Sequence, residues 1–142
     1  MVARTESAIH QGLVRELANW LEHSKGFRIF GADLPEYESP AIIANNGLGD
    51  GERKQPDVIA YDPVEGVFIN GEAKTGEGDL TTQHTKTQFL LFSSLQNSQN
   101  RKSSWLYVIV PPNQIGPLES VIHELGLGNK PNILLVRSSL FA

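Results

Sequence analysis

The chain contains no cysteine, which excludes a disulfide framework and a thiolate metal site. It has no apolar run approaching the roughly 20 residues of a membrane-spanning helix, and its first residues lack the apolar stretch of a signal peptide. We therefore expect a cytoplasmic protein with no membrane partner, although export without a signal peptide stays open. Basic residues are fewer than acidic ones, 12 against 16, and the formal net charge is −4. A nucleic-acid ligand would therefore depend on local basic patches rather than on overall attraction.

The composition that remains is that of an ordinary globular protein, with 39% hydrophobic and 20% charged residues. A length of 142 residues is enough for one domain with a substantial core. We find no internal repeat and no low-complexity tail. The sequence therefore predicts a single domain over residues 1–142.

Two strand-like segments separated by a short turn organise the rest of the chain. Residues 58–61 are apolar and β-prone, residues 62–66 carry an Asp-Pro start and a glycine end typical of turns, and residues 67–74 are a second strand candidate. A loop this short predicts that the two strands pair as an antiparallel hairpin.

The hairpin would bring three charged side chains together. Side chains alternate along a strand, so Glu72 and Lys74 should share a face while Ala73 points to the other. Pairing places Asp57, at the start of the first strand, near both, at an edge that we expect to be open to solvent. One or two carboxylates can hold Mg²⁺ and leave positions for water and substrate phosphate. A lysine beside the metal can position an attacking water or offset charge on a phosphate oxygen.

Pro56-Asp57, fourteen intervening residues and Glu72-Ala73-Lys74 resemble the active-site signature of the PD-(D/E)xK nuclease superfamily. The superfamily includes restriction endonucleases, and this chain is most similar to its viral-type replication-repair nucleases and Holliday junction resolvases. The resemblance implies that Asp57 and Glu72 bind Mg²⁺ or Mn²⁺, that the Ala73 carbonyl is a further ligand, and that Lys74 positions or activates water. It also implies a restriction-endonuclease-like core.

A further acid could come from the first helix, which apolar residues at helical spacing predict over residues 6–24. Glu6 lies in line with this apolar stripe. It is either a partner of the helix dipole or a third acid of the metal site, because the replication-repair nucleases begin with a similar pattern, which Glu6, Ile9 and Gln11 resemble. Glu16 is the rival acid, and we expect it on a solvated face.

A second helix, predicted over residues 81–96, offers a glutamine to the same site. Family members similar to this chain carry a helix glutamine after the Glu-x-Lys strand that contributes to the active site. Gln88 is the candidate, because it shares a face with Phe92 whereas Gln83 points the opposite way. The alternative is a glutamine at a helix edge that is bonded to backbone.

The remaining patterns predict strands at residues 27–30, 105–110 and 133–136, a helix at 114–127, and an irregular loop over 31–54. The fold class is therefore α/β, with the order α-β-β-β-α-β of the restriction-endonuclease-like core, an additional C-terminal helix and strand, and a mixed central sheet. A crossover helix makes the strands before and after it parallel. The long loop is either a flap over a substrate groove or a surface insertion.

Together these patterns predict a metal-dependent nuclease that hydrolyses phosphodiester bonds in DNA. Asp57 and Glu72 would hold the metal, Lys74 would act on water, and Gln88 and Glu6 would complete the site. The alternatives are a non-catalytic nucleic-acid-binding or assembly module on the same fold, and a small α/β protein in which these charges form a surface ion-pair cluster. A domain this small cannot surround a duplex alone, so double-strand cleavage would call for a homodimer or a higher homo-oligomer.

Overall fold

The computed structural model describes residues 3–141, with side chains from residue 8 onward. Five strands form one sheet in the order β1-β2-β3-β4-β5. They are β1 (Arg28–Ala32), β2 (Val58–Asp62), β3 (Val67–Ala73), β4 (Trp105–Val110) and β5 (Ile133–Arg137). The first three strands are antiparallel neighbours, whereas β3, β4 and β5 run parallel. The predicted hairpin, the parallel pairing across the second helix and the mixed sheet are all confirmed.

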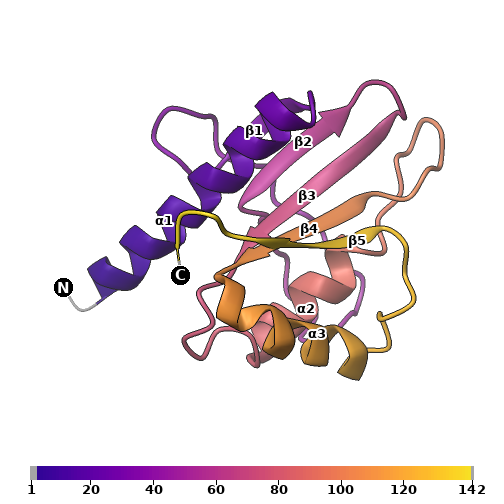
Figure 1. Cartoon of the computed structure of the whole chain (residues 1–142). Helices are drawn as coiled ribbons and strands as arrows, with labels where there is room; N and C mark the ends of the chain where they lie inside the picture. Colours follow the sequence, from indigo (N-terminus) through magenta and orange to yellow (C-terminus); the bar gives the residue numbers. More distant parts are fainter. Residues whose placement is uncertain (1–2, 142) are drawn as a thin grey trace.

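The helices cover the two faces of this sheet (Figure 1). They are α1 (Ala3–Asn19), continued by a π-helical turn (Trp20–Ser24), then α2 (Gln83–Phe92) and α3 (Ile115–Glu124). The order of helices and strands is the predicted one. The second helix is shorter than predicted, because the Thr82 hydroxyl accepts a hydrogen bond from the Thr85 N–H and caps its start. None of the helices in residues 3–141 has the length and apolarity needed to cross a membrane.

The strand β4 separates two apolar cores, one on each face of the sheet. Tyr107 and Ile109 belong to the core under α1, and Leu106, Val108 and Val110 belong to the core under α2 and α3. A strand buried on both faces reads as an unbroken apolar run, and such strands sit in the middle of parallel regions. This is why residues 105–110 were identifiable from the sequence with the correct bounds.

The α1 helix packs closely on β3. Its fully buried residues are Leu13, Val14, Leu17, Ala18 and Leu21. A Cβ atom on Gly71 would lie 2.8 Å from Leu17 Cδ2 and 3.1 Å from Val58 Cβ, so only glycine allows this approach. The apolar residues that the sequence places on one stripe are Ile9, Leu13, Leu17, Trp20 and Leu21; the three leucines are buried, but Ile9 and Trp20 are only half-buried, and Val14 and Ala18 are buried in their place. In the observed phase, the position that precedes Leu13 and Val14 by three and four residues is His10.

Candidate active site

The Asp57 carboxylate lies against the end of β3, as the predicted hairpin requires. The strands β2 and β3 pair with Val58 opposite Gly71, and the Asp57 N–H donates to the Gly71 carbonyl at 3.0 Å. The Asp57 Oδ2 atom accepts a hydrogen bond from the Ala73 N–H at 2.9 Å. Asp57 is therefore held by backbone at both its main chain and its side chain, which fixes its carboxylate beside Glu72.

A glutamine from α2 joins the other two predicted residues. The Gln88 Nε2 atom donates to Glu72 Oε1 at 2.8 Å, and Lys74 Nζ donates to Gln88 Oε1 at 2.6 Å. The structure thus brings Asp57, Glu72, Lys74 and Gln88 together. The alternative for Gln88, a bond to backbone at a helix edge, is not what these contacts show.

The expected open edge is wrong for this end of the sheet. Glu72 is 1% exposed, Gln88 5% and Lys74 7%. The reason is that α2 packs over the end of β3 and places an amide between the acid and the ammonium. A surface ion-pair cluster is therefore also wrong, because the Lys74 ammonium is buried and bonded to an amide rather than to either carboxylate.

The pKa values of the two carboxyl groups are shifted in opposite directions. Burial raises the pKa of Glu72 well above its ordinary value, and the negative charge of Asp57 raises it further. Burial also pushes the pKa of Asp57 upward, but hydrogen bonds from His10, from Glu72 and from the Ala73 N–H outweigh it and leave that pKa below its ordinary value. A proton held by this pair therefore favours Glu72 over Asp57, as in other close carboxyl pairs.

Two residues that the sequence analysis did not assign, His10 and Asp33, lie beside Asp57. His10 Nε2 is 3.1 Å from Asp57 Oδ2, and that hydrogen bond raises the pKa of His10. Ligand atoms of His10, Asp33 and Asp57 lie within 4.8 Å of one another. The phase of the buried stripe on α1 could have identified His10. Asp33 could have been found only by pairing β1 with β2, since its N–H donates to the Asp57 carbonyl at 2.8 Å.

The remaining predicted residues, Glu6, Glu16 and Ala73, differ in their position relative to this site. Glu6 lies in α1, four residues before His10, but its side chain is outside the described part of the chain. Glu16 is engaged elsewhere, because its carboxylate accepts hydrogen bonds from the Ser138 hydroxyl and the Ser139 N–H, both at 2.6 Å. Ala73 lies between Glu72 and Lys74 in sequence and donates its N–H to Asp57 Oδ2. The role of its carbonyl as a ligand stays a prediction.

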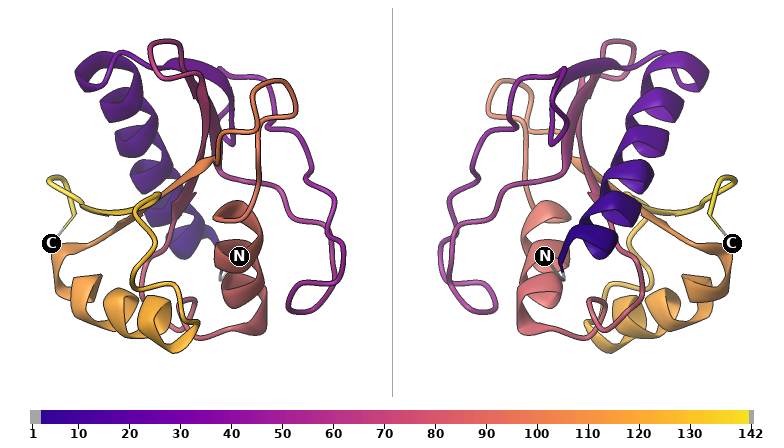
Figure 2. Two further views of the ribbon diagram at one scale, coloured as in Figure 1. Left: turned by 90° about the vertical axis from the view of Figure 1, so that its right-hand side faces the viewer. Right: turned by 90° about the vertical axis from the view of Figure 1, so that its left-hand side faces the viewer.

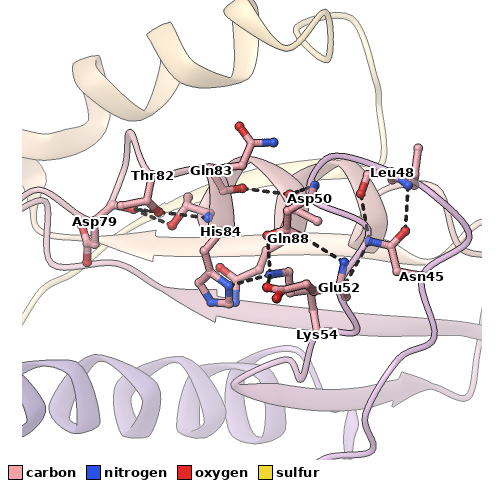
Figure 3. Close-up of polar contacts among 12 residues, drawn as sticks. Asn45, Leu48, Asp50, Glu52, Lys54, Asp79, Thr82, Gln83, His84 and Gln88 are labelled. Atoms are coloured by element: carbon pink, nitrogen blue, oxygen red, sulfur yellow. Dashed lines mark hydrogen bonds and ion pairs between the residues drawn. The ribbon is translucent and has the colours of Figure 1, made fainter.

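The loop between β1 and β2 lies on the face of the sheet opposite α1 and is docked on α2 (Figure 2). The buried Lys54 ammonium lies 2.8 Å from Asp50 Oδ2 and 2.8 Å from His84 Nδ1 (Figure 3). The Asp50 N–H donates to the Thr87 hydroxyl at 3.0 Å. Gly49 adopts φ +53°, and a Cβ there would collide with the Thr87 side chain. The loop is therefore held on α2 rather than loosely inserted, and its last residue before β2 is Asp57.

Replacing Lys54 by methionine should release this loop from α2. The change removes the ammonium from Asp50 and His84, and hydrogen bonds to charged groups are among the stronger ones. We expect amide hydrogen exchange in residues 44–54 to become at least severalfold faster, with little change in β4. Arg53→Met, at the exposed neighbouring position, is the matched control. Unchanged exchange in Lys54→Met would show that Thr87 and the backbone alone hold the loop.

The donors around Asp57 are those that suit a hard divalent cation. Carboxylate oxygens of Asp57, Glu72 and Asp33 match the preference of Mg²⁺, and the His10 imidazole is a ligand that Mn²⁺ also accepts. The Lys74 ammonium has donors beyond the one given to Gln88, and these can reach a water or a phosphate oxygen. Comparisons of the chain with protein-family models, with curated proteins and with solved structures found no match.

Proposed function

We propose that this protein is a metal-dependent nuclease built on a restriction-endonuclease-like core and that it hydrolyses phosphodiester bonds in DNA. The observation that carries the proposal is the contact network at the end of β3. Asp57, Glu72 and Lys74 come from the spacing that resembles the nuclease signature, and a single amide, that of Gln88, bridges the acid and the lysine. The order of elements around them is the order that the resemblance implies.

Each residue has a defined task in such a site. Asp57 and Glu72 would hold Mg²⁺ or Mn²⁺, with His10 or Asp33 completing the ligands on the far side of Asp57. When bound, the metal would stabilise negative charge on the phosphate and lower the pKa of a ligated water. Gln88 fixes Lys74 Nζ at 2.6 Å, so that the ammonium is oriented before substrate arrives. Lys74 then directs its remaining N–H donors to the attacking water or to a phosphate oxygen.

A non-catalytic nucleic-acid-binding or assembly module is the second candidate. The observation that favours it is the burial of Glu72 and Lys74, since a buried and fully paired polar network can serve the fold alone. The net charge of −4 gives the chain little general attraction to nucleic acid, so within this candidate it favours an assembly module over a nucleic-acid-binding one.

Metal titration followed by a cleavage panel separates the two candidates. A metal site should raise the melting temperature with Mg²⁺ or Mn²⁺, because a ligand that binds only the folded state stabilises it. We expect this shift, lost in Asp57→Asn, together with cleavage of at least one substrate among single-stranded, duplex and branched DNA. The same panel in RNA tests the assignment to DNA. If neither Mg²⁺ nor Mn²⁺ changes the melting temperature and no substrate is cleaved, the non-catalytic module is supported.

A further inference from the structure

Three aromatic rings form a cluster on the part of the sheet that α2 leaves uncovered. Phe30 stacks on Tyr61 with ring centroids 6.0 Å apart, and Phe68 meets Phe30 at 5.7 Å and Tyr61 at 4.9 Å. Phe30 is 48% exposed. The Arg28 guanidinium lies 5.5 Å from the centre of the Phe30 ring. None of these rings belongs to the cores under the described helices.

A β-bulge presents Phe30 on this face. Ile29 pairs with Ala60 and Gly31 pairs with Ile59, so Phe30 is the extra residue between two consecutive pairs. A bulge re-aims a side chain and is common beside functional sites. Exposing a large apolar ring at a sheet edge also carries a risk of aggregation. The local distortion therefore places a ring where folding alone would not require one.

The cluster is one wall of a cavity of about 550 Å³. Phe30 and Phe68 line it together with loop residues 38–43 and the segment between α2 and β4. This volume lies within the range of small-molecule sites. Asn70 reaches the cavity from β3, and its only side-chain hydrogen bond among the described residues is a long one, 3.5 Å to the Phe92 carbonyl. The amide of this buried residue thus has hydrogen-bonding capacity left for a ligand that has donors and acceptors on its edge.

We propose that this cavity binds a nucleobase of a single-stranded segment next to the bond that is cleaved. The inference rests on the proposed function, and it names the substrate class. Stacking of a base on an aromatic side chain contributes about 1–3 kcal/mol to single-strand binding and tolerates any base. Asn70 and Glu72 lie two residues apart on one face of β3, about 6.6 Å along the strand. A base stacked on Phe68 and paired with Asn70 would therefore belong to a nucleotide adjacent to the one at Glu72.

The distribution of charge favours a single strand over an intact duplex. Duplex binding relies on neutralising many phosphates, whereas this chain has a net charge of −4 and a carboxylate, Glu38, at the cavity. A carboxylate repels phosphate but can accept from the amino group of a base. Arg28 is the cation at this end of the cluster. Affinity that comes from stacking at this cavity should then fall less steeply with salt than the affinity of a basic single-strand-binding groove.

Binding measured without catalysis tests the inference. The probe is a single-stranded deoxyoligonucleotide containing 2-aminopurine, whose fluorescence responds to stacking, titrated with full-length protein in EDTA so that no cleavage occurs. We expect Phe30→Ala, which removes the ring that packs on Phe68 in the cavity wall, to weaken binding at least about fivefold, the lower end of the effect of losing one stacking ring, and to reduce the fluorescence change. Leu140→Ala, at another exposed apolar residue, should bind like the native chain. Asn70→Ala, which removes a buried amide, is read only alongside its melting curve.

Three outcomes would overturn the inference. The first is equal affinity of native protein and Phe30→Ala, and the second is tighter binding to a duplex of the same sequence. The third is a concentration-dependent dimer in sedimentation that Phe30→Ala dissolves, which would make the aromatic cluster an interface between copies of the chain. If the protein cleaves DNA but Phe30→Ala does not change its affinity, only this inference is wrong. If Phe30→Ala weakens binding but the native protein cleaves nothing with any metal, the proposed nuclease activity is wrong and the protein is a single-strand-binding module.

Discussion

Lys74→Ala should lower the rate of Mg²⁺-dependent cleavage by about 10²–10⁴-fold, the usual effect of losing a positioned proton-transfer group. The ammonium is held 2.6 Å from Gln88 Oε1 and is buried at the end of β3. Because the ammonium is already held in place, it does not have to be reorganised as charge develops in the transition state. An interaction that is stronger in the transition state than in the ground state raises the rate of cleavage. Asp57→Ala should abolish cleavage altogether, since the Asp57 carboxylate lies in contact with both His10 and Glu72, and its carbonyl accepts from the Asp33 N–H.

The readout must separate chemistry from folding, because both residues are largely buried. Removing Lys74 leaves the Gln88 carbonyl without its donor, at a cost of about 1–3 kcal/mol. Lys74→Ala should therefore melt at a lower temperature while keeping its far-ultraviolet circular dichroism. Lys25→Ala, at an exposed lysine that lies over the Trp20 ring, is the matched control. Cleavage by Lys74→Ala at the native rate would remove that residue from the mechanism, whatever its stability.

Local patterns were sufficient for the order of elements and for the pairing at the candidate site. Alternation along a strand places Glu72 and Lys74 on one face, a short turn forces β2 and β3 to pair, and helical spacing selects Gln88 over Gln83. Each of these rules acts within a few residues. The contacts at the end of β3 follow from them, so that part of the site was predictable.

The burial of the site and its extra members depend on contacts that no local pattern contains. Asp33 and Asp57 meet only because β1 pairs with β2 across the intervening loop. That loop docks on α2 through Lys54, whose place in the charged run of residues 52–54 gives no sign that it is buried. His10 was missed because the predicted apolar stripe on α1 included Ile9 but not Val14, whereas Val14 is fully buried and Ile9 is not. The spacing of apolar residues identifies the apolar face of a helix, but the contacts with the sheet determine which residues of that face are fully buried.

The metal-free protein should lose stability as the pH rises through the pKa of Glu72. That pKa is raised in the folded state, first by burial and then by the charge of Asp57. The folded chain consequently binds more protons than the unfolded chain between the ordinary pKa and the raised one, and stability falls across that interval. Urea unfolding at several pH values in EDTA measures the effect, and Glu72→Gln should remove it because an amide carries no titrating proton. If Glu72→Gln shows the same dependence of unfolding free energy on pH as the native protein, a residue other than Glu72 is responsible for it.

Metal affinity should show the opposite dependence and rise with pH. A cation bound by Glu72 must displace its proton, so affinity should increase up to tenfold for each pH unit below the raised pKa and level off above it. Asp57 adds no slope near neutral pH, because its pKa lies below the ordinary value. His10 adds a second proton, since its pKa is raised by Asp57 and imidazolium cannot ligate a metal. Calorimetric titration with Mn²⁺ in two buffers of different ionisation enthalpy counts the protons released. On binding Mn²⁺, Glu72→Gln should release one proton fewer than the native chain, and so should His10→Asn. An affinity that does not change with pH would mean that the cation binds neither residue.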